Sequence, residues 1–203
     1  VGDTPYILWM LMGIIPWFFI APSVLQGSNS VHQKIGLVSK MNFPVSVLPT
    51  ITLVSNARNF FVLSVVFFII LFAYGFDLSI YIIQLPYFIF SLFAFVFAFL
   101  IFSSTISTMI RDYQMLLQSA MRMLFFLTPI LWDVSSSPEL LANLLKLNPF
   151  YYIVDGIRAS FLGNYWFYEQ PIYFCYFWLL TFVILYFGSR FHIRFKKDFV
   201  DYL

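Results

Sequence analysis

The sequence predicts an all-α integral membrane protein, and three observations support this fold class. Of the 203 residues, 62% are apolar and only 10% are charged, whereas about 25% are charged in an ordinary soluble domain. The mean hydropathy is +0.88. The apolar residues form long runs, such as the stretch from Phe60 to Tyr74, whereas the strands of a membrane barrel would alternate polar and apolar positions. Helices are therefore the expected spanning elements.

Five segments have the roughly 20 mostly apolar residues that a helix needs to cross a bilayer. Their residue ranges are 5–25, 57–76, 85–110, 112–133 and 171–189. We see no internal repeat among them. The sequence therefore predicts five transmembrane helices within this chain.

The basic residues predict the orientation of these spans, because short cytoplasmic loops collect Lys and Arg. One set of loops and ends carries only Lys146 and Arg158, and the opposite set carries seven: Lys34, Lys40, Arg111, Arg190, Arg194, Lys196 and Lys197. We therefore expect a multi-pass plasma membrane protein with a cytoplasmic C-terminus. Five spans then place Val1 outside, so we expect one more span upstream and six in the full protein.

A polar segment between the first two spans, residues 27–50, is predicted to be cytoplasmic. Val31, Ile35 and Val38 follow helical spacing, which indicates a short amphipathic helix at the inner membrane surface, ended by Pro44 and Pro49. The helix could simply rest on lipid, or it could present Lys40 to Phe43 to a cytoplasmic partner. The pattern alone leaves both interpretations open.

The outer segment, residues 135–170, contains two short amphipathic pieces. Ser137 can cap the first piece, and Asn148 with Pro149 stops it. The second piece runs from residue 151 to 162 and ends at Gly163. Because neither piece is long enough to cross the membrane, we predict an outer re-entrant or surface-lying helical hairpin. It would serve as a lid, or it would shape an exit for something that leaves the membrane.

Few residues of this chain suggest chemistry of their own. Arg122 is the single charge of the fourth span, so it should face protein, water or an anionic ligand, or snorkel toward the inner surface. His32 and His192 have no carboxylate or cysteine at ligand spacing, and we interpret both as solvated or interfacial. A single cysteine, Cys175, forms neither an internal disulfide nor a multi-cysteine metal site. We therefore expect no catalytic residue and no metal site in this chain.

Missing sequence features exclude several functions. None of the nine acids lies inside a predicted span, which disfavours proton- or ion-coupled transport. The sequence has no Gly-Lys pair and so no phosphate loop for ATP. A net charge of +2 gives no broad cationic surface for nucleic acid. If the protein pumps, another subunit must supply the energy.

Several sequence motifs resemble a known family. They are VSKMNFP at residues 38–44, the Leu-Pro-Thr turn at 48–50, IIQL at 82–85 and RDYQMLLQSAMRMLFFLTPILW at 111–132. The Asn-Pro pair at 148–149 and the basic, aromatic tail ending DFVDYL add to this likeness. The chain thereby resembles the permease of an ABC-2 type exporter for polysaccharides or polyol phosphates, most of all the Gram-positive wall teichoic acid translocation permease.

The resemblance implies a functional assembly. Two permease copies would pair, and each would dock on an ATP-hydrolysing subunit that holds ATP and Mg²⁺, so this chain itself would need no cofactor. A coupling helix over residues 29–43 would touch that partner through His32, Gln33, Lys34, Ser39, Lys40, Met41, Asn42 and Phe43. The cargo would be a polyprenyl-pyrophosphate-linked anionic glycopolymer, and its path would be lined by Trp9, Trp17, Arg122, Phe126 and Trp132.

The alternative hypothesis is a stand-alone intramembrane transferase or channel. It requires activity without a nucleotide-binding partner. A stoichiometric ATPase subunit in the purified protein would separate the two hypotheses.

Overall fold

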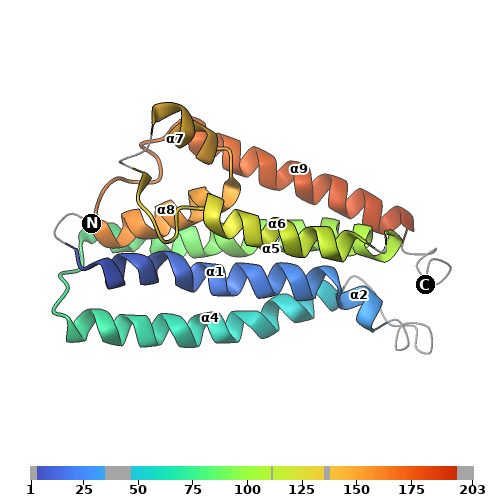
Figure 1. Cartoon of the computed structure of the whole chain (residues 1–203), viewed down its shortest axis with the longest axis horizontal. Helices are drawn as coiled ribbons and strands as arrows, with labels where there is room; N and C mark the ends of the chain where they lie inside the picture. Colours follow the sequence, from blue (N-terminus) through green and yellow to red (C-terminus); the bar gives the residue numbers. More distant parts are fainter. Residues whose placement is uncertain (1–3, 35–46, 111, 135–137, 196–203) are drawn as a thin grey trace. The chain divides into compact units, whose positions relative to one another are not determined.

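The computed structural model describes residues 4–34, 47–110, 112–134 and 138–195, which contain helices and no strand (Figure 1). The elements are α1 (Tyr6–Ser28), α2 (Ser30–Gln33), α4 (Val47–Ala73), η1 (Ile80–Gln84), α5 (Leu85–Met109), α6 (Tyr113–Leu127), α7 (Glu139–Leu145), α8 (Pro149–Leu162) and α9 (Pro171–Phe195). The predicted all-α fold class is confirmed.

Four helices of the described residues are long and apolar enough to cross a membrane: Tyr6–Ser28, Val47–Ala73, Ile80–Met109 and Pro171–Arg194. They correspond to four of the five predicted spans. The prediction for residues 112–133 was too long, because α6 has only 15 residues and ends at Leu127. Pro129 explains this end, since proline lacks an N–H group and its ring clashes with the carbonyl one turn earlier.

Two prolines have roles other than those the sequence suggested. Pro49 was expected to end the preceding amphipathic helix, but it lies in the first turn of α4, where its missing N–H leaves no helical hydrogen bond unmade. Pro149 was expected to stop a helix, but it begins α8, and the side chain of Asn148 caps this helix by accepting a hydrogen bond from the Phe150 N–H at 3.0 Å. The same residues therefore act as start signals.

The chain divides into two compact units, and each long helix contributes to both. The first unit comprises Val1–Phe18, Phe60–Phe93 and Arg122–Trp178, and the second comprises Phe19–Asn59, Ala94–Met121 and Leu179–Leu203. The short elements η1, α7 and α8 belong to the first unit, and α2 belongs to the second.

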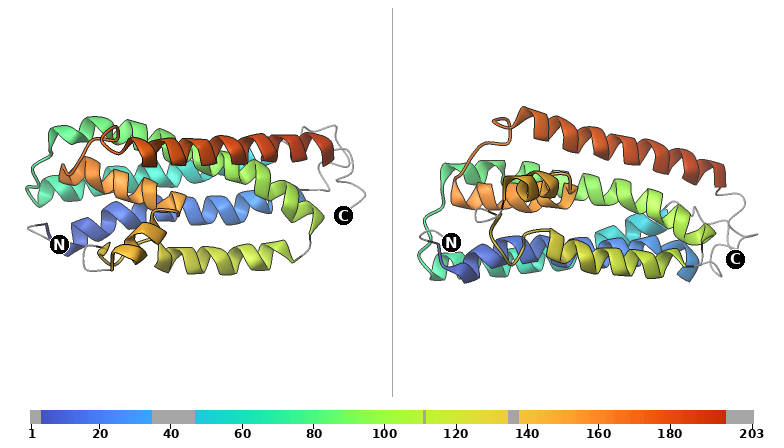
Figure 2. Two further views of the ribbon diagram at one scale, coloured as in Figure 1. Left: turned by 90° about the horizontal axis from the view of Figure 1, so that it is seen from above. Right: turned by 45° about the horizontal axis from the view of Figure 1, so that its top comes forward.

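The core of the first unit is α8. Eleven of its fourteen residues are buried, so this helix is enclosed on all sides, although its amphipathic pattern had suggested one apolar face. It lies against the first turns of α5, as the orange and green ribbons of Figure 2 show. A Cβ atom on Gly156 would lie 1.9 Å from Cε1 of Phe88. The absence of a side chain at Gly156 therefore allows this close approach.

Aromatic rings fill the space around α8 within the first unit. Phe161 packs edge-on against Phe67 with a centroid separation of 5.3 Å, and Tyr152 stacks on Phe177 at 4.4 Å. The Tyr152 hydroxyl is also hydrogen-bonded to the Tyr87 hydroxyl at 2.8 Å. Rings that combine a large apolar surface with a polar tip thus connect α8 to the helices of its unit.

Small and hydroxyl-bearing residues mediate the helix contacts of the second unit. The Gln114 side chain donates to the Leu25 carbonyl at 2.8 Å and accepts from the Ser28 hydroxyl at 3.0 Å. His192 is buried and hydrogen-bonded through Nδ1 to the Thr105 hydroxyl at 3.1 Å. His192 was expected to be solvated or interfacial; its burial excludes the solvated alternative, and its place in the basic tail gave no sign of a partner on α5. Polar side-chain contacts of this kind are typical between membrane helices.

Replacing Gly156 with alanine should destabilise the first unit. The new methyl group would displace the ring of Phe88, and overpacking of this kind costs about 1–3 kcal/mol. We expect a lower thermal unfolding midpoint for the detergent-solubilised protein. Combining Gly156→Ala with Phe88→Leu provides a control, because a smaller side chain at position 88 should relieve part of the clash. A double variant whose loss equals the sum of the two single losses would contradict this explanation.

Candidate functional site

Only part of the predicted coupling helix lies in the described residues. In α2, Val31 is buried and the Ser30 hydroxyl donates to the Gly27 carbonyl at 2.7 Å. His32, Gln33 and Lys34 are exposed. The other predicted coupling residues, Ser39, Lys40, Met41, Asn42 and Phe43, lie outside the described residues. The docking role of this segment stays a prediction.

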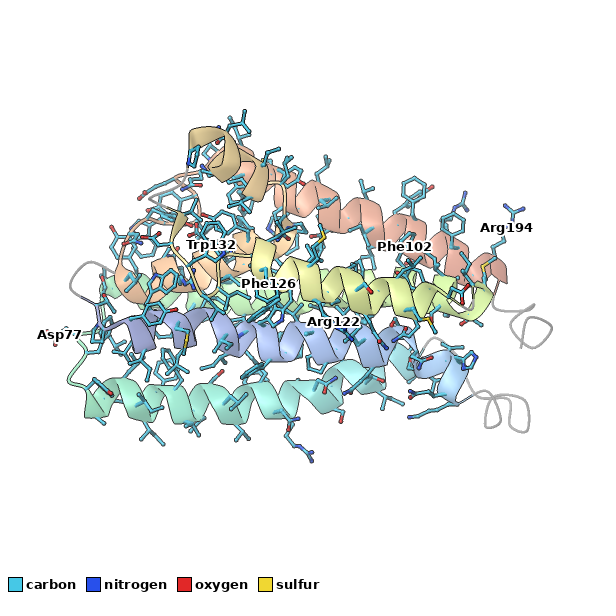
Figure 3. The ribbon with its side chains drawn as sticks, in the orientation of Figure 1. Asp77, Phe102, Arg122, Phe126, Trp132 and Arg194 are labelled. Carbon is cyan, nitrogen blue, oxygen red and sulfur yellow. The ribbon has the colours of Figure 1, made fainter. Side chains whose placement is uncertain are left out.

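The five predicted path residues all belong to the first unit, but they differ in exposure. Trp9 and Trp17 are each only 5% exposed. Arg122 and Phe126 are exposed on α6, one helical turn apart (Figure 3). Trp132 is half-buried, and its indole N–H donates to the Phe126 carbonyl at 3.0 Å. The structure therefore brings Phe126 and Trp132 together, while their role in a path remains a prediction.

Trp17 is enclosed by other aromatic rings. Its ring centroid lies 5.7 Å from that of Phe125 and 5.8 Å from that of Phe150. These contacts join α1 to α6 and to the start of α8 within the first unit. In this chain alone, Trp17 therefore acts as a packing residue.

A buried arginine that sequence reasoning did not select forms the main polar centre of the first unit. Arg158 of α8 is 5% exposed. Its Nη1 donates to the Pro129 carbonyl, and its Nη2 donates to the Ile130 carbonyl at 2.7 Å. The guanidinium carbon also lies 3.6 Å from the ring centroid of Trp9. We call these four residues the Arg158 clamp.

The clamp provides hydrogen-bond donors for backbone carbonyls of residues 128–134, which follow α6 and which we call the post-α6 segment. A third carbonyl of this segment, that of Leu131, accepts a hydrogen bond from the Tyr6 hydroxyl at 2.7 Å. The Asn148 amide also donates to the Thr128 hydroxyl at 2.9 Å. Carbonyls beyond a helix end need such donors when they are buried. The post-α6 segment is thus held by side chains from α1 and from the start and middle of α8.

The planar fork of an arginine explains the choice of residue at position 158. It can donate to two adjacent carbonyls while its flat face stacks on an indole ring. Gly13 of α1 provides the space, because a Cβ atom there would lie 2.6 Å from Nη2 of Arg158. From the sequence, Arg158 was expected only to be a basic residue of the outer segment. The available signal was an Arg three residues after an Asp in an otherwise apolar and aromatic helix.

The charges around the clamp influence one another. Burial lowers the pKa of Arg158 to about 10, and the nearby Asp155 carboxylate opposes that shift. Burial raises the pKa of Asp155, and the hydrogen bond from the Tyr165 hydroxyl, Arg158 and Lys146 oppose the shift, whereas Asp133 adds to it. At neutral pH the guanidinium therefore remains charged, while burial favours the protonated form of Asp155.

A second polar side chain orders the loop after α8. Gln84 of η1 is buried, and its amide nitrogen donates to the Tyr165 carbonyl while its amide oxygen accepts from the Phe167 N–H, both at 2.9 Å. Gln84 thereby positions Tyr165, whose hydroxyl donates to Asp155. In the sequence, Gln84 was notable only as part of the IIQL motif at residues 82–85. Its role, to hold the loop after α8, is seen in these two hydrogen bonds.

Comparison with known proteins identifies the class of this chain. Residues 2–162 match the family model of ABC-2 type transporters. Because this match covers more than half of the chain, the chain belongs to the ABC-2 type transporter family. Its four membrane-length helices agree with a membrane protein of that class.

Three relatives carry the same kind of name, O-antigen export system permease protein RfbA. The chain is 30% identical to the Myxococcus xanthus protein over 156 residues, which is 75% of this chain and 60% of that relative. It is 24% and 26% identical to two Klebsiella pneumoniae proteins over 199 and 160 residues, covering 98% and 78% of this chain and 76% and 62% of those relatives. The chain thus spans about 60% of the Myxococcus relative's length.

Replacing Arg158 with lysine should loosen the post-α6 segment. An ammonium group cannot donate to both carbonyls in the same plane or stack as a flat cation. One charged hydrogen bond is worth about 1.5–3 kcal/mol, so we expect a loss of about 2–4 kcal/mol. Thermal unfolding would measure this loss of stability, and hydrogen exchange should show faster exchange of the amides in residues 128–134. The exposed Arg122→Lys exchange is the matched control and should stay within about 0.5 kcal/mol. Equal effects of the two exchanges would argue against the clamp.

Asp155 should make the stability of the protein depend on pH. Because its folded-state pKa is raised, the folded state binds more protons than the unfolded state above the ordinary aspartate pKa. Its contribution to stability is therefore complete at low pH and is lost as the pH rises through the folded-state pKa. Asp155→Asn should consequently become more stable relative to the wild type between pH 4 and pH 8. Unfolding midpoints at several pH values test this, and a constant difference would refute it.

Proposed function

We propose that this chain is the membrane-spanning permease of an ATP-driven exporter that moves a lipid-linked polysaccharide across the plasma membrane. The observation that carries the proposal is the ABC-2 family match over residues 2–162, together with relatives that are named O-antigen export permeases. The sequence adds support, because the long helices contain no acidic residue that could couple transport to an ion.

The energy for export would come from partner subunits. In this proposal two permease copies each dock on an ATPase that binds ATP and Mg²⁺. The segment from residue 29 to 43 transmits the movement of the ATPase, and the C-terminus lies on the same cytoplasmic side. The exposed side chains of His32, Gln33 and Lys34 are compatible with a contact to such a partner.

The cargo is proposed at two levels. The coarser proposal is a lipid-linked polysaccharide, which the names of the relatives support. The finer candidate is a teichoic acid, a polyol phosphate polymer on polyprenyl pyrophosphate, which the motifs at residues 38–44 and 111–132 favour. The exposed guanidinium of Arg122 on α6 suits a phosphate.

Depleting the chain in its native cell should test the proposal directly. Lipid-linked polymer should accumulate at the inner leaflet, and chemical analysis of that polymer would separate an uncharged polysaccharide from a polyol phosphate polymer. The chain purified in mild detergent should carry an ATPase subunit in stoichiometric amount. Activity of a solitary chain without any nucleotide-binding partner would instead support the intramembrane transferase or channel.

Alanine substitutions of Asn42 and Phe43 should weaken the coupling between export and ATP hydrolysis. We expect polymer-stimulated ATP turnover to fall severalfold while the thermal midpoint of the permease stays the same, because these residues would contact the partner rather than the core. The exposed Lys146, which lies on the predicted outer side, provides the control exchange Lys146→Ala. Unchanged stimulation in the Asn42 and Phe43 variants would exclude the docking role.

A further inference from the structure

A polar cavity borders the Arg158 clamp within the first unit. It has a volume of about 410 Å³ and is lined by Trp9 of α1, Asp133 of the post-α6 segment and the α8 residues Tyr151, Asp155 and Arg158. Pockets for small molecules typically measure about 300–1,000 Å³. The cavity is therefore large enough for a small ligand, and the elements that line it belong to the predicted outer side.

Polar groups of this cavity keep hydrogen-bonding capacity for a ligand. Within the described part of the chain, the Tyr151 hydroxyl makes no hydrogen bond, and neither does the exposed Asn164 amide at the cavity wall. Asp155 uses only Oδ2 to accept from Tyr165. The cavity thus offers hydroxyl and amide donors together with hydroxyl, amide and carboxylate acceptors. A ligand that both donates and accepts hydrogen bonds at several positions fits this set.

The lining of the cavity suits an anion less well than a neutral ligand. Two acidic side chains, Asp133 and Asp155, line it together with one guanidinium. That guanidinium already donates to the carbonyls of Pro129 and Ile130. Its Nε atom is buried without a hydrogen-bond partner. A phosphate would therefore meet the oxygens of two acidic side chains, beside a guanidinium that is already partly used by the protein's own carbonyls.

A metal cation fits less well than a neutral ligand. The described residues contain no group of three or more His, Cys, Asp or Glu side chains that could hold a metal ion. The ring of Tyr151 adds apolar surface to the cavity wall, and the C–H groups of a sugar ring can pack against such surface. A sugar carries hydroxyl groups around a ring with apolar C–H faces, so it matches both the polar groups and the apolar surface of the cavity wall.

We propose that this cavity is a subsite for one uncharged sugar unit of the exported polymer. The proposal rests on the proposed function and narrows its cargo to a polymer that contains neutral sugar units. Tyr151, Asn164 and Asp155 bind the sugar hydroxyls, and the Arg158 clamp fixes the walls of the site. A sugar held on the predicted outer side would resist backward movement of the polymer between successive steps of the exporter.

Binding of simple glycosides to the purified full-length chain, with any bound ATPase retained, tests the subsite. The probes are methyl glycosides of glucose, galactose, mannose and N-acetylglucosamine, with glycerol phosphate as the anionic comparison. Saturation-transfer NMR should detect saturable binding of at least one neutral glycoside and weaker binding of glycerol phosphate. No saturable binding of any neutral glycoside, or tighter binding of glycerol phosphate, would overturn the proposal.

Variants locate the binding in the cavity. Tyr151→Phe combined with Asn164→Ala removes two hydrogen-bonding groups and should weaken glycoside binding about tenfold. The exposed Asp77, which does not line the cavity, provides the control Asp77→Asn with unchanged binding. If the double variant unfolds, Asn164→Ala alone replaces it, because this side chain is exposed. Full affinity in a folded variant would overturn the assignment of the site.

The two proposals fail in different ways. Normal ATP-dependent export by a chain that binds no glycoside rejects the subsite and leaves the exporter standing. The other outcome is a chain that binds glycosides but has no ATPase partner and exports no polymer. That outcome rejects the exporter, and with it the role of the subsite in export.

Discussion

Buried carbonyl groups that have lost their helical partners must find donors, and this constraint shapes the first unit. Pro129 ends α6 early, and the next carbonyls would be unsatisfied in an apolar environment. Arg158 and Tyr6 donate to them. One side chain of α8 thereby holds the residues that follow the end of α6.

Both units join their helices through rings and polar side chains. In the first unit the rings around α8 act with the Arg158 clamp, and in the second unit the Phe102–Phe191 pair acts with hydroxyl, amide and imidazole groups. Close helix packing in the second unit depends on glycine, because a Cβ atom on Gly188 would lie 3.0 Å from the Phe102 backbone nitrogen.

The sequence predicted the helical class and four of the membrane-length helices, because long apolar runs depend only on local composition. It did not predict the end of α6 or the start of α4, since Pro129 and Pro49 have opposite effects that depend on their place in a turn. It selected Trp9 but not Arg158, although they form one contact. The partners of Arg158 lie 28 and 29 residues away, and no local pattern reveals such a pairing. His192 and Thr105, 87 residues apart, were missed for the same reason.

The distribution of charge connects the fold to the proposed transport. The four membrane-length helices of the described residues carry no acidic residue, which agrees with the proposed supply of energy by a partner subunit. Within the first unit, Arg158 and Asp155 lie near each other, where Arg158 donates to backbone carbonyls and Asp155 lines a cavity. Arg158 spends one N–H of each Nη group on the protein's own carbonyls, so its first role here is to hold the chain. Recognition of a sugar at this cavity, as proposed, would rest on hydroxyl and amide groups, which distinguish sugars by shape and hydrogen bonding rather than by charge.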